Sequence, residues 1–255
     1  MRALVTFLAF CLLAAPAAAQ EVVGVESPSM PGEIWPCGAG CRIEWWSHRP
    51  DIWNRARVQL SIDGKQSWFT LAECIPNLGG WNWTVPARTE SDRCYIRVDA
   101  AWDCETWGRM DINDDPFIIT EGPTATVLPI EADSLVSGGC IDVSLEVENH
   151  SGRQLTLWYD LDMADPALNI HDDPANDLQF TIGAGDVKTV TRPFCMPWGV
   201  PEGTWTLKAI LWSVRDGDRY AGPKLYDSGW IHPTTVATWA SSWGAVKAAG
   251  GTARR

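Results

Sequence analysis

The sequence has few of the residues from which catalytic and metal centres are usually built. It contains four His, and no two of its cysteines form a CxxC pair, so a structural zinc site is disfavoured. It also lacks a GxSxG nucleophile elbow and a cysteine-nucleophile motif. We therefore expect no enzymatic activity, although spacing alone does not exclude a carboxylate pair for glycoside hydrolysis, because the fold decides that separation.

Basic residues and long apolar runs are scarce as well. The chain has 20 Lys and Arg against 32 Asp and Glu, which gives a formal net charge of −12. An acidic surface repels phosphate groups, which argues against nucleic acid and anionic membranes as partners. The apolar run near the start is shorter than the roughly 20 residues that cross a bilayer, so no membrane span is expected.

Residues 1–19 have the pattern of a cleaved secretory signal. Arg2 precedes the apolar run, and Ala17 and Ala19 form an A-x-A cleavage site. The alternative, an uncleaved anchor, is disfavoured by the length of the run. We expect a mature chain that begins near Gln20 and is secreted, periplasmic or at the cell surface.

In an exported chain, cysteines are expected to form disulfides. Cys140 and Cys195 are the only two cysteines of the second half. A disulfide between them would contribute on the order of 4 kcal/mol to folding stability by the chain-entropy model. The first half has five cysteines, so at least one is free or bonded to another chain. Two kinds of bridge are open there: Cys94 with Cys104, and Cys37 with Cys41 or Cys74.

Helical periodicity is nearly absent, and short β-rich runs separated by Gly, Pro, Asn and Asp recur instead. This pattern predicts an all-β chain of two tandem antiparallel immunoglobulin-like β-sandwiches, at 20–120 and 121–235, followed by a flexible tail at 236–255. The boundary lies at the breaker Glu-Gly-Pro that begins at residue 121. The expected strands cover residues 42–46, 56–62, 68–72, 81–85, 94–100 and 116–120, then 125–130, 140–147, 154–161, 178–182, 187–193, 204–214 and 225–231.

One hairpin is marked clearly. Val58, Leu60 and Ile62 alternate with polar residues, so one face of this strand should be buried. Asp63 and Gly64 follow directly, and an Asp-Gly pair supplies the positive φ angles of a tight hairpin.

The first unit carries a series of motifs in a fixed order: SPSMPGEIW (27–35), RIEWW (42–46), IPNLGGWNWTVP (75–86) and CYIRV (94–98). This series resembles the immunoglobulin-like and fibronectin-III-like domain of the Kre9/Knh1 N-terminal type over about residues 22–120. The resemblance implies a non-catalytic sandwich at or outside the cell envelope, in a family linked in fungi to cell-wall glucan assembly. Five cysteines in place of one, and no Ser/Thr-rich stalk, depart from the family pattern. The second unit is loosely similar to CARDB and other immunoglobulin-like modules.

Tryptophan is the strongest anomaly of composition, with 16 residues against 6 Phe and 4 Tyr. Four of them, Trp35, Trp45, Trp68 and Trp83, occupy motif positions and are expected to be structural. Exposed indoles are flat apolar platforms suited to stacking on sugar rings or to protein interfaces. Strand alternation predicts outward side chains for Trp46 and Trp81. Three others, Trp53, Trp102 and Trp107, fall in predicted loops, and these five tryptophans are the candidate ligand-binding residues. Packing between the two domains is the competing use.

Acidic clusters are the candidates for metal. Asp111, Asn113, Asp114 and Asp115 offer several hard oxygen donors for Ca²⁺, although a plain turn is the favoured interpretation and the spacing is not that of an EF-hand. A similar cluster in the second unit comprises Asp160, Asp162, Asp165, Asp172, Asp173 and Asp177.

Two hypotheses for function follow. The first is an exported, non-catalytic binding or adhesion module at the cell envelope, whose partner is a polysaccharide or a surface protein, with no cofactor beyond the Ca²⁺ alternative. The second is a structural component of a surface assembly, with tryptophans buried at interfaces and an intermolecular disulfide. The sequence leaves the oligomeric state open.

Overall fold

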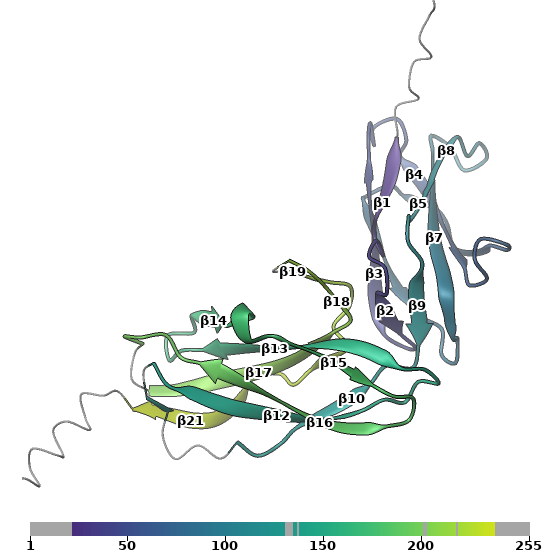
Figure 1. Cartoon of the computed structure of the whole chain (residues 1–255). Helices are drawn as coiled ribbons and strands as arrows, with labels where there is room; N and C mark the ends of the chain where they lie inside the picture. The colour runs from purple at the N-terminus through teal and green to yellow at the C-terminus, as the bar shows by residue number, and fades with distance from the viewer. Residues whose placement is uncertain (1–21, 131–134, 137, 201–202, 218, 238–255) are drawn as a thin grey trace, which may run out of the picture.

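The computed structural model describes residues 22–130, 135–136, 138–200, 203–217 and 219–237. The strands form two β-sandwich bodies, β1 to β9 and β10 to β21, which Figure 1 shows as separate and inclined to one another. The predicted all-β class is confirmed, since the helical structure of the described residues is limited to the short turn η1 (Pro174–Asn176). The expected signal at 1–19 lies outside the described residues, as does the tail beyond Ala237.

In the part of the chain that the structure describes, no helix is long and apolar enough to cross a membrane.

The first sandwich contains two sheets that pack face to face. The smaller sheet has the order β1-β3-β6, from β1 (Val23–Ser27), β3 (Gly40–Ser47) and β6 (Gly80–Thr84). The larger sheet has the order β2-β9-β7-β4-β5, with β8 against β7. Its strands are β2 (Ile34–Pro36), β9 (Phe117–Thr120), β7 (Ser91–Ala101), β4 (Arg55–Ser61), β5 (Phe69–Pro76) and β8 (Arg109–Ile112).

Alternation along the strands builds the core of this sandwich. Ala56, Val58 and Leu60 of β4 are buried, as the sequence pattern predicts, and they pair with buried residues of β7. Large indoles fill the space between the sheets, with Trp35 and Trp45 each about 1% exposed. The core therefore uses several of the tryptophans that the motifs marked as structural.

The hairpin between β4 and β5 has a longer turn than the sequence suggested. Leu60 pairs with Phe69, so the connection runs well past Asp63 and Gly64, and the expected tight hairpin is wrong, although Gly64 has the expected positive φ of 76°. The reason is the carboxylate of Asp63, whose Oδ1 accepts hydrogen bonds from Ser61 Oγ at 2.8 Å and from the amide of Ser67 at 2.9 Å. An aspartate that captures nearby backbone amides stabilises a wider loop.

The second sandwich also has a small and a large sheet. The small sheet has the order β10-β12-β16, from β10 (Thr124–Val127), β12 (Cys140–Glu148) and β16 (Val187–Cys195). The large sheet has the order β11-β21-β17-β13-β14, with β15 on β13 and β20 on β17, and β18 and β19 form a hairpin. These strands are β11 (Leu135–Val136), β21 (Ile231–Ala237), β17 (Gly203–Trp212), β13 (Leu155–Ala164), β14 (Ile170–Asp172), β15 (Leu178–Ile182), β20 (Tyr226–Asp227), β18 (Val214–Asp216) and β19 (Arg219–Ala221).

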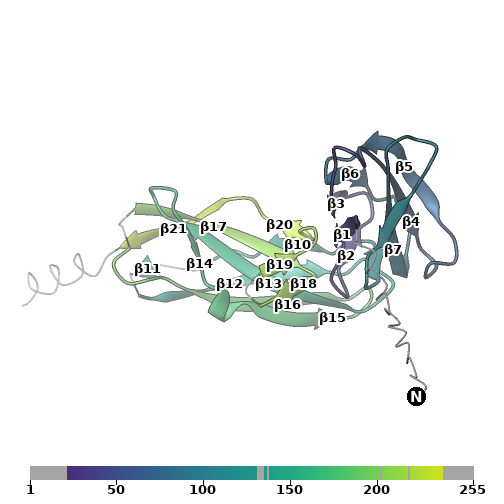
Figure 2. The ribbon, with the colours of Figure 1, turned by 90° about the horizontal axis from the view of Figure 1, so that it is seen from above.

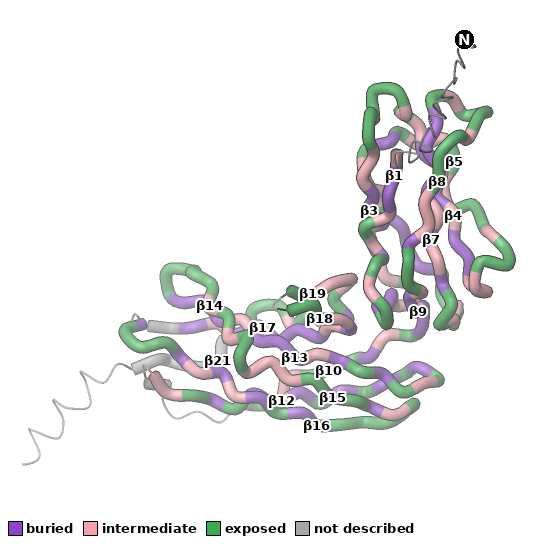
Figure 3. Tube along the Cα trace, turned by 45° about the horizontal axis from the view of Figure 1, so that its top comes forward, coloured by how far each residue is buried: buried purple, intermediate pink, exposed green. Residues whose placement is uncertain are grey.

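Strand β12 shows the alternation of a strand with one buried face, which Figure 3 displays as alternating colours along the tube. Ile141, Val143, Leu145 and Val147 are buried against the facing sheet. In β13 the odd-numbered residues face the same core, so Asp160 and the other even-numbered residues point to the outer face of the large sheet.

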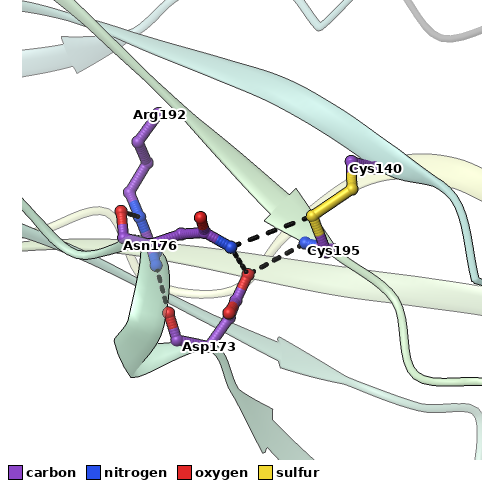
Figure 4. The surroundings of a disulfide bond; sticks show 5 residues. All are labelled: Cys140, Asp173, Asn176, Arg192 and Cys195. Carbon is purple, nitrogen blue, oxygen red and sulfur yellow. Dashed lines mark hydrogen bonds between the residues drawn. A yellow bond between two sulfur atoms is a disulfide. The ribbon is translucent and has the colours of Figure 1, made fainter.

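The second sandwich has the disulfide expected from the sequence, between Cys140 and Cys195. The two cysteines are direct partners in the β12–β16 register. Figure 4 shows how polar groups hold this end of β16: the Oδ2 atom of Asp173 accepts a hydrogen bond from the Cys195 amide at 3.0 Å, and Arg192 donates to the carbonyl of Asp173 at 2.7 Å.

The first sandwich pairs its cysteines differently from either expectation. The bond joins Cys74 to Cys104, while Cys37, Cys41 and Cys94 are free. The proposed Cys94–Cys104 bridge is wrong because Cys94 lies on β7 with its side chain in the core, fully buried. The loop after β7 instead folds back across the sheet toward β5, which brings Cys104 to Cys74.

The two sandwiches are joined by more than the connection between β9 and β10, which lies at the expected boundary. The amide of Ile34 donates a hydrogen bond to Ser213 Oγ at 3.0 Å, and the Ile34 side chain packs into the core of the second sandwich. Arg153 forms an ion pair with Asp92 at 3.4 Å. Figure 2 shows β2, which carries Ile34, at the end of the first sandwich that faces the second.

Candidate functional site

Two of the five candidate tryptophans stack on each other on the first sandwich, and a third lies in the same loop as one of them. Trp53 lies in the loop between β3 and β4, and Trp102 and Trp107 lie in the loop between β7 and β8. The rings of Trp53 and Trp102 are stacked, with centroids 5.6 Å apart and an interplanar angle of 19°. A Cβ atom added at Gly108 would lie 3.3 Å from the Trp53 ring, so this loop approaches Trp53 closely. We call Trp53, Trp102 and Trp107 the tryptophan platform.

The backbone of Trp53 is held in place by the buried side chain of Asn77. The Nδ2 group of Asn77 donates hydrogen bonds to the Trp53 carbonyl at 2.6 Å and to Ser47 Oγ at 3.0 Å. Its Oδ1 accepts a hydrogen bond from Trp45 Nε1 at 2.7 Å. One amide thus joins the loop that carries Trp53 to an indole of the core.

The loop that carries Trp102 is organised by Asp103. The Oδ1 atom of Asp103 accepts hydrogen bonds from the amides of Glu105 at 3.0 Å and Thr106 at 2.7 Å, and Oδ2 accepts one from Trp102 Nε1 at 2.6 Å. These backbone hydrogen bonds, above all that from Thr106, hold the pKa of Asp103 below its usual value. The next residue, Cys104, bonds to Cys74 of β5, so this loop is also held covalently.

Trp107 lies over a charged network on the outer face of the larger sheet. The guanidinium carbon of Arg57 is 4.6 Å from the centre of the Trp107 ring, a cation–π contact. Arg57 also donates to Asp99 at 3.1 Å, and Arg97 reaches the other oxygen of the same carboxylate at 2.7 Å. The Asp99 side chain is only 2% exposed, and its charge is balanced by Arg57 and Arg97.

The platform presents an accessible apolar surface with polar groups at its edge. Trp102 is 56% exposed although one face of its ring lies on Trp53, so its other face and edge are open. Met110, which pairs with Asp99 and shares its face of the sheet, is also exposed. Two carboxylates belong to this region. Asp103 accepts a hydrogen bond from the Trp102 indole, and Glu73 lies 3.9 Å from Arg57. Such a surface can stack on a flat apolar ring and accept hydrogen bonds around it.

The other two candidate tryptophans are placed elsewhere. Trp46 points outward from β3, as predicted, and lies on Gly24 of β1 with its ring 4.9 Å from that of His48. The outward direction predicted for Trp81 is wrong, because Trp81 pairs with the buried Ile43 and shares its face with Trp83, two residues along the same strand. Trp81 packs against the core of the first sandwich.

The acidic run 111–115, at the end of β8 and just beyond it, makes structural hydrogen bonds. The Oδ2 atom of Asp111 accepts a hydrogen bond from the Val25 amide at 2.8 Å, which ties β8 to β1. The buried Oδ1 of Asn113 accepts one from the Ile96 amide at 2.6 Å. Asp114 and Asp115 are exposed. One oxygen each of Asp111 and Asn113 thus accepts a backbone hydrogen bond, and the Ca²⁺ site considered for these four residues stays a prediction.

Sequence reasoning did not identify Arg57, Asn77 or the Cys74–Cys104 bond as parts of this region. Arg57 had one available signal, since it alternates with buried residues of β4 and so had to face outward. Its contact with Trp107 joins positions 50 residues apart, and no local pattern encodes such a contact.

No protein-family profile and no curated protein matches the chain. Among solved structures, it is similar to the FN1-FN3 domains of chicken CNTN1, with a TM-score of 0.35 and 12% identity over 85% of this chain and 67% of that one. A DUF4785 family protein from Legionella pneumophila gives a TM-score of 0.40 and 11% identity, over 84% of this chain and 56% of that one. Trypsin-activated alpha-2-macroglobulin from Escherichia coli gives 0.28 and 9%, over 82% of this chain and 18% of that one.

Proposed function

We propose that the protein is an exported, non-catalytic binding module that holds a polysaccharide on the tryptophan platform of its first sandwich. The observation that carries this proposal is the stacked pair of Trp53 and Trp102, in which Trp102 stays 56% exposed. Exposing a large indole to water has a free-energy cost, which burial against a ligand recovers at about 25 cal/mol per Å².

The chemistry of the platform suits a sugar ring. The C–H face of a pyranose is apolar and can lie flat on the open face of Trp102. Its hydroxyl groups can donate hydrogen bonds to the carboxylate of Glu73, which is exposed and lies 3.9 Å from Arg57. An acidic edge in a chain of net charge −12 favours a neutral glycan over an anionic one.

The platform is also held in place before any ligand arrives. Asn77 fixes the loop of Trp53, and Asp103 and the Cys74–Cys104 bond fix the loop of Trp102. A rigid surface loses little conformational entropy on binding, which benefits a site whose contacts are few.

Three of the four histidines contact neighbouring side chains, and the proposal assigns none of them a role in a reaction. His48 packs on Trp46, His150 contacts Thr124 Oγ1 at 2.8 Å, and His171 packs on Trp205. The expected signal at 1–19 and the two disulfides support export. The resemblance of residues 22–120 to the Kre9/Knh1 N-terminal type agrees with a place among envelope polysaccharides.

The test is binding to a panel of insoluble polysaccharides, including β-glucan, cellulose and chitin, followed by calorimetry with soluble oligomers of the one that binds. Trp102→Ala is expected to weaken binding at least tenfold, which corresponds to about 1.4 kcal/mol. Phe69→Ala is the matched control, because Phe69 is an exposed aromatic residue of the same sandwich, on β5. Equal binding by wild type and Trp102→Ala would contradict the proposal.

A second candidate is a structural protein linked to another chain by a disulfide. It is favoured by Cys37, the half-buried member of the free cysteines, whose thiol donates to the Thr89 carbonyl at 3.0 Å. This candidate requires a covalent dimer on a non-reducing gel that disappears in Cys37→Ser. A monomer under both conditions leaves the binding module as the proposal.

A further inference from the structure

A group of three carboxylates lies on the outer face of the second sandwich, far along the chain from the tryptophan platform. Asp160 and Asp162 are even-numbered residues of β13, and Asp172 belongs to the edge strand β14. One side-chain oxygen from each of the three lies within 4.8 Å of the others. Asp162 and Asp172 are direct partners in the register, and like charges placed directly opposite one another destabilise a sheet.

The cations around this group are committed to other carboxylates. Asp177 pairs with Arg192 at 3.1 Å and with Arg215 at 3.3 Å. Asp227 pairs with Lys208 at 3.3 Å and with Lys224 at 2.8 Å. Among the described residues, no ion pair reaches Asp160, Asp162 or Asp172. Lys208 is the direct register partner of Asp162 on β17, but its ammonium group pairs with Asp227, so no ion pair within the described residues joins it to the three carboxylates.

Asp160 adds an independent observation, because its carboxylate is buried and only half satisfied. The residue is 5% exposed, and its Oδ2 accepts a hydrogen bond from Trp212 Nε1 at 3.2 Å. Its Oδ1 is buried and has no hydrogen-bond partner within the described chain. A buried carboxylate oxygen without a partner costs several kcal/mol unless another group coordinates it.

The structure also separates these three residues from the other acids of the same region. Asp165 accepts hydrogen bonds from Ala167 and Asn169 and closes the loop before β14. Asp173 holds the Cys195 amide, and Asp177 is neutralised by its two arginines. Of the six acids that the sequence grouped together, Asp160, Asp162 and Asp172 are the three that bring one oxygen each to within 4.8 Å of the others.

We propose that Asp160, Asp162 and Asp172 bind a Ca²⁺ ion on the outer face of β13 and β14. The ion would take one oxygen from each carboxylate, including the orphaned Oδ1 of Asp160, and complete its six to eight ligands with water at the exposed side of Asp172. The bound ion would offset the repulsion between Asp162 and Asp172, because both carboxylates would be attracted to it. It would thereby hold the short edge strand β14 against β13.

The tolerance of Ca²⁺ for irregular coordination favours Ca²⁺ over Mg²⁺ at this group. Ca²⁺ accepts carboxylate oxygens at about 2.3 to 2.6 Å in flexible geometry, so one ion can contact three oxygens that lie within 4.8 Å of one another. The smaller ion demands a near-ideal octahedron and gives up its water reluctantly, which a fixed pair of strands does not accommodate.

The first test uses Tb³⁺ as a luminescent substitute for Ca²⁺ on the full chain after treatment with EDTA. Trp212, which donates to Asp160, is placed to sensitise the emission. Sensitised emission that Ca²⁺ displaces is expected in the wild type. Asp162→Asn and Asp172→Asn should each lower the affinity at least tenfold. Asp142→Asn is the matched control, because Asp142 is an exposed aspartate on β12 of the same sandwich.

The second test measures the unfolding temperature with and without Ca²⁺. A ligand that binds only the folded state raises this temperature as its concentration passes the dissociation constant. In EDTA, Asp172→Asn should be at least as stable as wild type, because it removes one of two opposed charges, so a lost Ca²⁺ response cannot be attributed to misfolding. The proposal is overturned by no response in the wild type, by equal responses in the wild type and both site variants, or by tighter binding of Mg²⁺.

Discussion

The disulfide between Cys74 and Cys104 fastens the loop that carries Trp102 to strand β5. Trp102 precedes Cys104 by two residues and stacks on Trp53 from a different loop. The disulfide therefore lies in the exposed loop of the candidate site and not in the core of the sandwich. This placement suggests that the bond maintains the shape of the tryptophan platform in addition to stabilising the fold.

Removing this bond is expected to weaken the platform more than the sandwich. In the chain-entropy view, a bridge that spans 30 residues contributes about 3 to 4 kcal/mol. Cys74→Ser with Cys104→Ser should make the loop at 102–108 sensitive to limited proteolysis and lower polysaccharide affinity. Cys140→Ser with Cys195→Ser is the control, because it removes the bond of the other sandwich and should lower stability without exposing this loop. Equal cleavage of the loop in both double variants would contradict this role.

Asn77 is expected to be the most sensitive polar residue of the first sandwich. Asn77→Ala removes the acceptor of the Trp45 indole and the donor to the Trp53 carbonyl. Leaving a buried donor unsatisfied costs about 1 to 3 kcal/mol, and the loop of Trp53 loses its anchor as well. Urea unfolding should report a loss of about 2 to 4 kcal/mol.

Asn82→Ala serves as the control for that measurement. Asn82 is exposed and accepts a hydrogen bond from Arg42 at 3.2 Å, so its removal should change stability by less than about 0.5 kcal/mol. Similar losses in the two variants would show that Asn77 does not have the anchoring role given to it.

Gly24 is expected to resist substitution because Trp46 covers it. A Cβ atom at residue 24 would lie 2.3 Å from Trp46 Nε1, so Gly24→Ala must displace the ring, at a cost of about 1 to 3 kcal/mol. Gly40→Ala, on the neighbouring strand with nothing within 4 Å of its added Cβ, should be tolerated. Thermal unfolding compares the two.

The contact between Gly24 and Trp46 can be isolated by a double-mutant cycle. Trp46→Ala removes the ring that the new Cβ would strike, so Gly24→Ala should cost less in that background. A coupling energy above about 0.5 kcal/mol is expected for residues in contact. Additive effects would mean that strain elsewhere makes Gly24 necessary.

Asp63 is expected to make the first sandwich sensitive to acid. Hydrogen bonds from Ser67, and then from Ser61, lower the pKa of Asp63 from 3.8 to about 2. Because the folded chain holds this proton less tightly than the unfolded chain, the contribution to stability is present above pH 3.8 and is lost as the pH falls through about 2. Asp63→Asn should remove this part of the acid dependence, which urea unfolding at a series of pH values measures. Asp114→Asn, an exposed acid of the same sandwich, should keep it, and parallel curves for Asp63→Asn and wild type would refute the assignment.

Local patterns in the sequence predicted most of the strands. The alternation of Val58 and Leu60 with polar neighbours identified the buried face of β4, and the same rule holds along β12. The outward prediction for Trp81 applied this rule incorrectly, because Trp81 and Trp83 are two residues apart on one strand and therefore share a face. The pairing of Cys140 with Cys195 followed from their isolation in the second half.

The choice of partners in the first sandwich could not be predicted in this way. Five cysteines allow several pairings, and the one that forms depends on where the loop after β7 lies in space. The acidic run at 111–115 and the acids of the second sandwich have similar compositions. In the first, backbone amides take the inner oxygens, and in the second, the register of β13 and β14 places Asp162 opposite Asp172.

The sequence by itself determined the class of the fold, because side-chain alternation and turn residues act over a few neighbouring positions. The sequence also indicated that some tryptophans lie outside the cores, since two small sandwiches cannot bury all 16 indoles. Only the tertiary structure decided which indoles meet, because Trp53 and Trp102 are 49 positions apart and are joined by loops whose paths depend on Asn77, Asp103 and a disulfide. Contacts of that length are set by the packing of two sheets, and a local pattern carries no information about them.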